Sequence, residues 1–183
     1  MKKARNLKTK FRNINDFYKD LKMILEISNI NTHNFERSVQ LINKVNQFNL
    51  TSRRYTESKL EVFLKSKSQF TFVGRVKDKF GDHGITALAM IKKNENSWII
   101  DNFLLSCRIL GRKVENIFLH EILKKLRVNK ISSLQGVYIK TNKNPQCKNF
   151  YTDNNFKKIK NNYFITTKNL KAINERYIKI KYE

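Results

Sequence analysis

The stretch Ile99–Glu115, IIDNFLLSCRILGRKVE, decides how this chain folds. Its first part, up to Leu105, is an apolar run typical of a buried strand, and a helical spacing of apolar residues begins at Val114. Between the two lies a turn that combines positive charge with a glycine: Arg108, Gly111, Arg112 and Lys113. A strand, a glycine turn and a helix start in this order aim backbone amides at a phosphate group. The stretch therefore predicts a site for a phosphorylated cofactor.

Two common phosphate-binding fingerprints do not occur in the sequence. Neither G-x-G-x-x-G nor G-x-x-x-x-G-K-[ST] is found anywhere in the chain. A Rossmann dinucleotide site and a P-loop are therefore both unsupported.

The residues before this stretch predict the centre of a mixed, mostly antiparallel sheet. Strand patterns at 70–76, 85–91 and 98–105 form a three-stranded antiparallel meander. Hairpin turns are expected at 79–84 and at 94–96.

The residues after the turn predict a change to parallel pairing. The clearest helix of the chain covers 114–126, and a strand over 133–139 follows it. A strand–helix–strand unit of this kind is a right-handed crossover, so its two strands are parallel. The other expected elements are helices over 16–21 (with Asn15 as N-cap), 32–45, 56–64 and 145–151, and strands over 23–27, 156–159 and 163–166.

Length and composition indicate one α/β domain in which helices flank the sheet. The chain has 183 residues, of which 40% are hydrophobic and 29% charged, enough for a core of its own. Residues 1–15 are interpreted as a basic lead-in or linker remnant, and 16–183 as the domain. No apolar run approaches the ~20 residues of a membrane span. The basic start lacks the apolar stretch of a secretory signal, which favours a cytoplasmic location without a membrane partner.

The cysteines and histidines predict neither disulfides nor a metal site. Cys107 and Cys147 do not make a disulfide framework, and Cys107 is interpreted as a buried small residue. The three histidines, His33, His83 and His120, have no metal-ligand spacing with either cysteine.

The net charge of +23, from 38 Lys and Arg against 15 Asp and Glu, favours polyanionic partners. These are nucleic acid, phosphorylated cofactors or acidic proteins. Lysine and asparagine are dispersed over the whole chain, which indicates a general compositional bias. Nucleic acid is therefore the weakest of these hypotheses, since only the charge supports it.

Three motifs, in order and on the expected elements, resemble the GNAT acyltransferase superfamily. Residues 108–113 are similar to its Q/R-x-x-G-x-G/A pyrophosphate loop for acyl-coenzyme A, with Lys113 where the superfamily has a small residue. Residues 150–156, FYTDNNF, are similar to its F-Y-x-x-x-G-F segment. Its N-x-x-A-x-x-x-Y helix is matched by Asn144, Cys147 and Tyr151. The resemblance implies a GNAT-like fold with a V-shaped opening between the parallel strands after the meander.

A longer similarity, from about residue 16 to the end, is to the C-terminal region of FkbH-like proteins. It is carried by 46–56 (NQFNLTSRRYT), 80–82 (FGD) and 103–108 (FLLSCR). FkbH-like proteins join a HAD phosphatase-like domain to a GNAT-like domain and load three-carbon units onto acyl carrier proteins. The HAD motif D-x-D-x-T/V does not occur here, which implies either an excised domain or a stand-alone relative with a separate HAD phosphatase-like partner.

The resemblance also implies roles for single residues. Tyr151 is the catalytic candidate, as the acid for the leaving thiolate; its alternative is a packed helix tyrosine. The cofactor-binding candidates are Phe103, Leu104, Leu105, Arg108, Ile109, Leu110, Gly111, Arg112, Lys113 and Asn144, and backbone amides near Leu104 and Leu105 would hold the thioester carbonyl. The substrate-binding candidates on the acceptor side are Asn46, Gln47, Asn49, Arg53 and Arg54; for the two arginines plain surface charge is the alternative.

The sequence does not identify the general base. Asp101 and His83 are possible, but Asp101 is expected on the solvated face of the sheet and His83 in an exposed turn.

The leading hypothesis is acyl transfer to a small biosynthetic acceptor in a bacterial pathway. The donor would be acetyl-coenzyme A, another acyl-coenzyme A, or a phosphopantetheine arm on a carrier protein. The alternative is a non-catalytic domain of the FkbH-like type that docks an acyl carrier protein or recognises a substrate, where +23 suits an acidic carrier.

Overall fold

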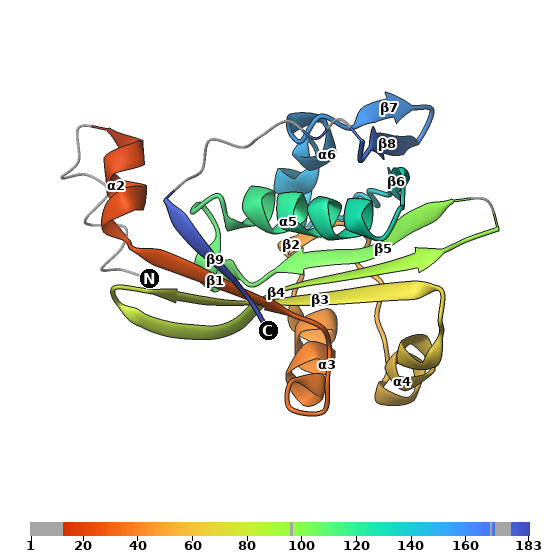
Figure 1. The fold of residues 1–183 in the computed structure, drawn as a ribbon, viewed down its shortest axis with the longest axis horizontal. Coiled ribbons are helices and arrows are strands. Elements are labelled where there is room, and N and C mark those ends of the chain that lie inside the picture. Colours follow the sequence, from red (N-terminus) through yellow and green to blue (C-terminus); the bar gives the residue numbers. More distant parts are fainter. Residues whose placement is uncertain (1–12, 96, 169, 171–176) are drawn as a thin grey trace.

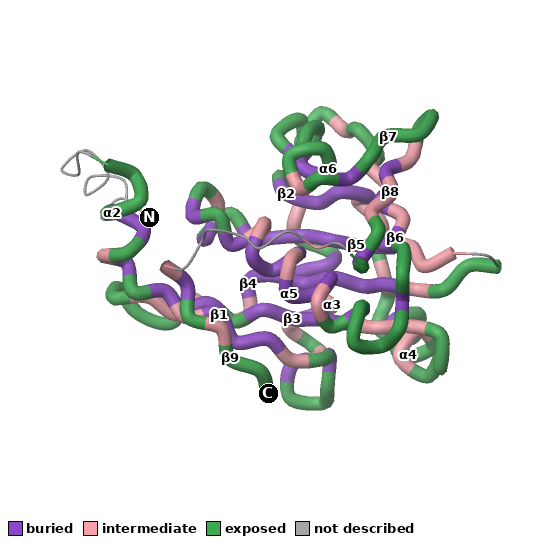
Figure 2. The backbone as a smooth tube through the Cα atoms, turned by 45° about the horizontal axis from the view of Figure 1, so that its top comes forward, coloured by how far each residue is buried: buried purple, intermediate pink, exposed green. Residues whose placement is uncertain are grey.

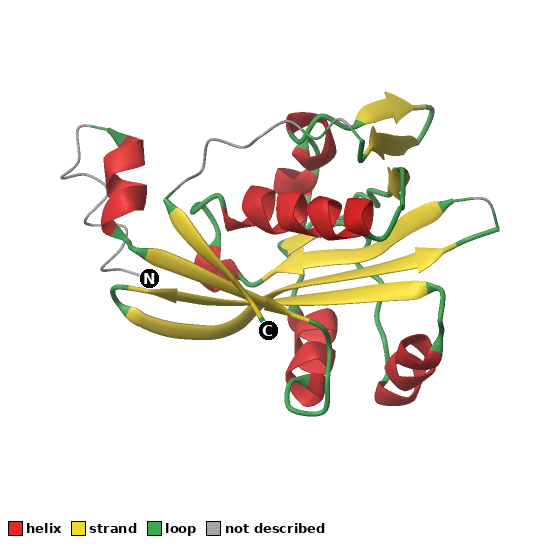
Figure 3. Ribbon diagram, viewed as in Figure 1, coloured by secondary structure: helices red, strands yellow, loops and turns green. Residues whose placement is uncertain are grey.

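The computed structural model of the chain describes residues 13–95, 97–168, 170 and 177–183. They form a nine-stranded mixed sheet with helices on both faces (Figures 1 and 3). The strands are β1 (Met23–Ser28), β2 (Phe48–Asn49), β3 (Gln69–Asp78), β4 (Gly81–Lys93), β5 (Trp98–Leu105), β6 (Ser133–Gly136), β7 (Lys157–Ile159), β8 (Asn162–Thr166) and β9 (Ile178–Tyr182). The helices are α2 (Ile14–Asp20), α3 (Phe35–Lys44), α4 (Glu57–Lys65), α5 (Val114–Val128) and α6 (Phe150–Asp153), with 3-10 turns η1 (Cys107–Ile109) and η2 (Pro145–Cys147).

The strand order is β7-β8-β6-β5-β4-β3-β1-β9, and β2 lies off this path against β5. The antiparallel meander β3-β4-β5 and the mixed, mostly antiparallel sheet are confirmed. The parallel crossover is confirmed as well: β5 and β6 are parallel, with the pair Ile99↔Gln135 as their registered contact. Beyond that pair the two strands separate, and this opens the V in the sheet.

Two hydrophobic cores hold the layers together. One lies between the sheet and α5, which buries an apolar face that includes Phe118, Ile122 and Leu126. The other lies under the opposite face, where α3 and α4 pack Leu41, Ile42 and Leu60 against the meander. Figure 1 shows α5 on one side of the sheet and α3 with α4 on the other. The central strands are accordingly buried on both faces (Figure 2).

Several expected boundaries need correction. The first helix begins at Ile14, because the side chain of Asn13, not Asn15, caps it by accepting a hydrogen bond from Asn15 N. The hairpin between β3 and β4 is tighter than expected: β4 already begins at Gly81, so His83 is a strand residue. Asn96, expected in the second hairpin turn, and residues 1–12 of the expected lead-in lie outside the described residues.

Two strands were not predicted. β9, with the sequence IKIKY, pairs parallel with β1. β2 has only two residues and pairs antiparallel with β5. β2 bears directly on function, because it lies inside the V.

Candidate functional site

Two left-handed residues set the backbone of the turn after β5. The chain passes through η1, then takes left-handed conformations at Gly111 (φ 78°) and Lys113 (φ 62°), and enters α5. A left-handed backbone suits glycine but strains lysine. Lys113 takes this conformation all the same, and its side chain is exposed.

The two arginines of this turn have different surroundings. Arg112 is 7% exposed, and its guanidinium pairs with the buried carboxylate of Asp78 and lies 3.2 Å from His83 Nε2. Arg108 is exposed, and its guanidinium reaches the backbone oxygen of His83 at 3.5 Å. Arg112 is thus engaged inside the protein, and Arg108 is the arginine of the turn that remains accessible. The prediction that both bind a pyrophosphate stays a prediction.

Asp78 and His83 form the internal partner of Arg112. His83 Nε2 lies 2.9 Å from Asp78 Oδ2, and the side chain of His83 is only 20% exposed. Burial acts to raise the pKa of Asp78, but hydrogen bonds from His83 and Phe80 N and the charge of Arg112 outweigh it and lower that pKa. The expectation that His83 lies in an exposed turn was wrong.

An acidic side chain, Glu115, lies in the first turn of α5. One of its carboxylate oxygens, Oε2, is buried and has no hydrogen-bond partner among the described residues. Burial raises the pKa of Glu115, only partly offset by its own backbone N–H and by Lys113. A carboxylate at the N-terminus of α5 competes with any phosphate for the same amides.

The V between β5 and β6 is filled by the chain itself. β2 pairs antiparallel along the free edge of β5, with Phe48 opposite Leu105 and Asn49 opposite Leu104. The hydrogen bond from Leu50 N to Phe103 O (3.0 Å) continues this ladder. The edge of β5 at Leu104 and Leu105, to which the resemblance assigns the thioester carbonyl, is therefore already paired.

Side chains lock the inserted segment in place. Phe48 packs against Phe103 and, edge-on at 5.3 Å between ring centres, against Phe150. Leu50 is fully buried, and its backbone oxygen accepts a hydrogen bond from Ile139 N at 2.8 Å. Burying two such side chains contributes about 1.5–3 kcal/mol each. Displacing the segment would thus cost a large part of the ~8 kcal/mol that a micromolar ligand provides.

Three predicted ligand-binding residues serve this insertion. Asn144 is fully buried, and its Nδ2 donates to Asn49 O (2.8 Å) and Ile139 O (3.0 Å). The side chain of Asn49 accepts from Ser52 N at 2.8 Å and so shapes the turn that follows. Gln47 presents its backbone oxygen to Gln146 Nε2 at 2.6 Å. The structure brings these residues together around β2, and their roles in ligand binding stay predictions.

Asp101 is the centre of a buried polar cluster under the V. Its carboxylate is fully buried, pairs with Arg53 and Lys92 (2.7 Å to Lys92 Nζ) and accepts a hydrogen bond from Tyr55 Oη at 2.5 Å. Burial acts to raise the pKa of Asp101, but the hydrogen bonds from Lys92 and Tyr55 and the charge of Arg53 lower it. The expectation of a solvated position was wrong. A carboxylate held in its charged form by two cations is a poor general base at neutral pH.

Arg54 also has partners within the protein. Its guanidinium donates to the backbone oxygens of Ile42 and Val45 at the end of α3 and to the side chain of Asn46. Arg53 and Arg54 thus both anchor the loop that follows β2, and their use as acceptor-binding residues stays a prediction.

Tyr151 is buried, whereas Cys107 is exposed. Tyr151 is 1% exposed, and its hydroxyl donates to Val137 O at 3.5 Å. Burial raises the pKa of Tyr151, and the backbone hydrogen bond offsets this only in part. Its ring lies against Gly136, where an added Cβ would come within 2.5 Å of the ring. Cys107 is exposed, so its expected burial was wrong; Ile109 of the same turn is buried, and Leu110 packs against the core.

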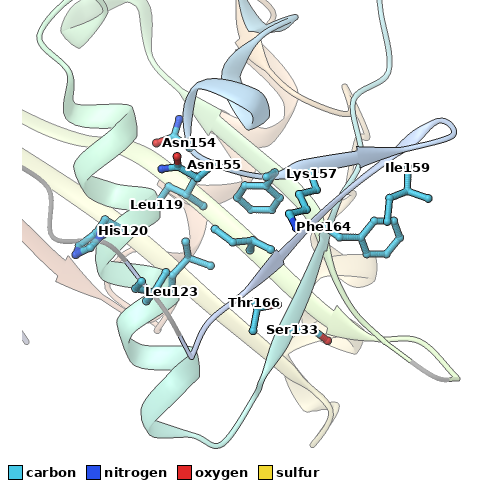
Figure 4. Close-up of a pocket in the computed structure, with 13 residues that line it drawn as sticks. Leu119, His120, Leu123, Ser133, Asn154, Asn155, Lys157, Ile159, Phe164 and Thr166 are labelled. Carbon is cyan, nitrogen blue, oxygen red and sulfur yellow. The ribbon is translucent and has the colours of Figure 1, made fainter.

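A cavity lies elsewhere, beside α5, α6 and the β7–β8 hairpin. It measures about 790 Å³. Figure 4 shows Leu119 and Leu123 of α5 on one side and Ile159 and Phe164 of the hairpin on the other. Lys157 lines it as well. The sequence analysis did not single out this cavity, because its apolar residues look like ordinary core positions of separate elements.

Comparison with known proteins identifies the fold. No family model and no curated protein matches the sequence. The structure is similar to the ribosomal-protein-S18-alanine N-acetyltransferase of Escherichia coli, with a TM-score of 0.61 at 9% identity over 84% of this chain and 98% of the other. It is also similar to a GNAT-family acetyltransferase of Staphylococcus aureus Mu50, with a TM-score of 0.60 at 14% identity over 79% and 99%. The chain has the GNAT fold.

A third GNAT-fold structure, the spermidine N-acetyltransferase of Vibrio cholerae, was solved in complex with CoA and spermine. The TM-score is 0.59 at 12% identity, over 78% of this chain and 95% of the other. At these identities the similarity shows the fold alone. None of the helices in the described part of the chain combines the length and the apolar character that a membrane crossing needs.

Proposed function

We propose that the chain is a non-catalytic recognition domain on the GNAT fold. It would dock an acidic partner, the acyl carrier protein of an FkbH-like loading system. One observation carries the proposal: β2 occupies the V along β5, at the edge where a pantetheine arm would need to pair. Phe48 and Leu50 are buried there, so the chain's own segment fills the slot.

The surface around the α5 cavity supports an acidic partner. On the edge strand β7, Lys157 and Lys158 are exposed, and Ile159 is 56% exposed. Basic side chains beside an apolar cavity suit an amphipathic helix that carries acidic residues on its polar face. This arrangement makes the β7–β8 hairpin the proposed docking surface.

Calorimetry with acetyl-coenzyme A at moderate salt tests the first half of the proposal, that the chain is non-catalytic. We expect no saturable heat, because the ligand must expel β2. Saturable binding with micromolar affinity would overturn this half of the proposal.

The test of the docking half is capture of purified carrier protein by the immobilised full chain. We expect the double variant K157Q/K158Q to weaken capture by about tenfold, since it removes charge at the docking surface. The matched control K59Q/K65Q removes the same charge from exposed positions of α4 and should leave capture unchanged. Equal loss in both double variants would mean that only net charge acts, and the hairpin would not be the docking site.

Acyl transfer from an acyl-coenzyme A or a carrier-bound thioester to a small acceptor is the second candidate. The left-handed turn at Gly111 and Lys113 favours it, because such a turn before a helix can aim backbone amides at a phosphate. In this reading residues 47–50 leave β5 and the acceptor attacks the thioester carbonyl while a base takes its proton. The C–S bond then breaks, and Tyr151 protonates the departing thiolate. Release of free thiol from acetyl-coenzyme A, abolished in Y151F, would support it; equal release by wild type and Y151F would count against Tyr151 as the acid.

A further inference from the structure

A second cavity, of about 420 Å³, lies on the α3 side of the sheet. β1, α3, β3, β4 and the turn after β5 contribute to its wall. Its lining includes Arg37, Arg75, Arg108, His83 and Glu26. This volume is within the range of small-molecule sites.

Two of these cations lack a counter-ion. Arg37 donates to Ile85 O (3.4 Å) and to the side chain of Gln40 (3.2 Å), and Arg108 donates to His83 O (3.5 Å). These partners are all neutral. No carboxylate of the described residues forms an ion pair with either guanidinium.

Three of the other titratable groups of the same cavity have ion-pair partners. Arg75 pairs with Asp82, with Nε 2.9 Å from Oδ2. Glu26 pairs with Lys77, whose Nζ lies 2.9 Å from both carboxylate oxygens. His83 pairs with Asp78, as described above. Arg37 and Arg108 are therefore the arginines of the cavity wall that have no ion pair, and the carboxylate of Glu183 is a further charged group of the same wall.

The charges of these two arginines act on one another. Burial lowers the pKa of Arg37, and the positive charge of Arg108 lowers it further. Two guanidiniums held beside one cavity without an anion repel each other, and an oxyanion between them would remove that repulsion.

We propose that this cavity binds an oxyanion group of a small molecule, a carboxylate or a phosphate, between Arg37 and Arg108. Guanidinium groups recognise both through paired N–H donors. The site is separate from the N-terminus of α5 and from the docking surface at β7. It makes Arg108 an anion-binding residue whether or not the chain binds coenzyme A.

The test is titration calorimetry of the full chain with sodium phosphate and, separately, sodium malonate, at constant ionic strength in chloride. We expect saturable binding of at least one anion, and which one binds tells a phosphate ligand from a carboxylate ligand. R37Q and R108Q should each lower the affinity by about tenfold or more. The matched control R127Q, at an exposed arginine in the last turn of α5, should change it by less than about twofold.

Thermal unfolding without added anion gives a second readout. R108Q should melt at a higher temperature than wild type, because it removes the repulsion of Arg37; an arginine with a purely structural role would give a lower one. No saturation with either anion, or equal loss of affinity in R127Q, would overturn the proposal. The failure of coenzyme A binding would leave it untouched.

Discussion

The V between β5 and β6 and the cavity beside α3 both adjoin the turn at 106–113, and they are built in opposite ways. In the V, polar groups of the inserted segment have internal partners and its apolar side chains are buried. In the cavity, the guanidiniums of Arg37 and Arg108 have no ion pair among the described residues. The fold alone suggests a ligand in the V, whereas the proposed anion site is in the cavity. A fold shared with enzymes does not by itself locate a ligand site.

The largest expected effect tests how firmly the V is closed. L50A should lower the free energy of unfolding by about 3–4 kcal/mol, because Leu50 is fully buried and its removal leaves a void beneath α5. Chemical denaturation measures the change. The control V62A, at a side chain that is 70% exposed on α4, should cost less than about 0.5 kcal/mol.

A loss in L50A as small as in V62A would mean that β2 is loosely held. The V would then be an opening with a movable cover, and the acyl-transfer function would gain over the non-catalytic one.

Much of the fold could be predicted from the sequence. The meander and the crossover to β6 follow from periodicity, because each long strand and α5 has an apolar face that must be buried. Short or mixed segments were harder: β9 alternates lysine with isoleucine, and it is a strand because β1 offers it a parallel edge. β2 has two residues, and no local pattern marks a pairing that depends on β5, fifty residues further along the chain.

The candidate site was predictable only as a set of residues. The resemblance assigns Asn49 and Arg53 to the acceptor side and Asn144 to cofactor binding. In the structure Asn144 contacts Asn49 of β2, and Arg53 lies in the loop after β2. Their contacts could not be predicted, since Asn144 holds the β2 backbone and Arg53 pairs with the buried Asp101. The sequence shows which residues are charged, but not whether a distant segment places an opposite charge beside them.

A smaller effect, with a definite pH dependence, is expected at the mouth of the V. The pKa of Glu115 is raised by burial, so the folded protein binds its proton more tightly than the unfolded chain does. The charged carboxylate thus destabilises the fold at neutral pH, and this penalty disappears as the pH falls through the raised pKa. E115Q should therefore stabilise the protein at pH 7 by about 1 kcal/mol and have little effect near pH 4.

The control for this prediction is E57Q in the first turn of α4, where the carboxylate is exposed and favours the helix dipole. It should cost roughly 0.3–1 kcal/mol at pH 7, the opposite sign. If the difference in free energy of unfolding between E115Q and wild type stayed constant from pH 4 to pH 8, Glu115 would carry no such penalty. The mouth of the V would then tolerate a second anion.

The smallest expected effect concerns Lys113, whose backbone is left-handed. K113G should raise the free energy of unfolding by about 0.5–1 kcal/mol, because glycine takes φ 62° without the strain that a Cβ adds. The matched control K148G makes the same exchange at φ −52°, where glycine only adds freedom to the unfolded chain, and it should destabilise by a similar amount. If K113G also fails to bind acetyl-coenzyme A, the lysine is not what excludes the ligand. The segment β2 must then be what closes the V. The V and the cavity beside α3 would therefore differ by the insertion of a whole segment and not by one substituted residue.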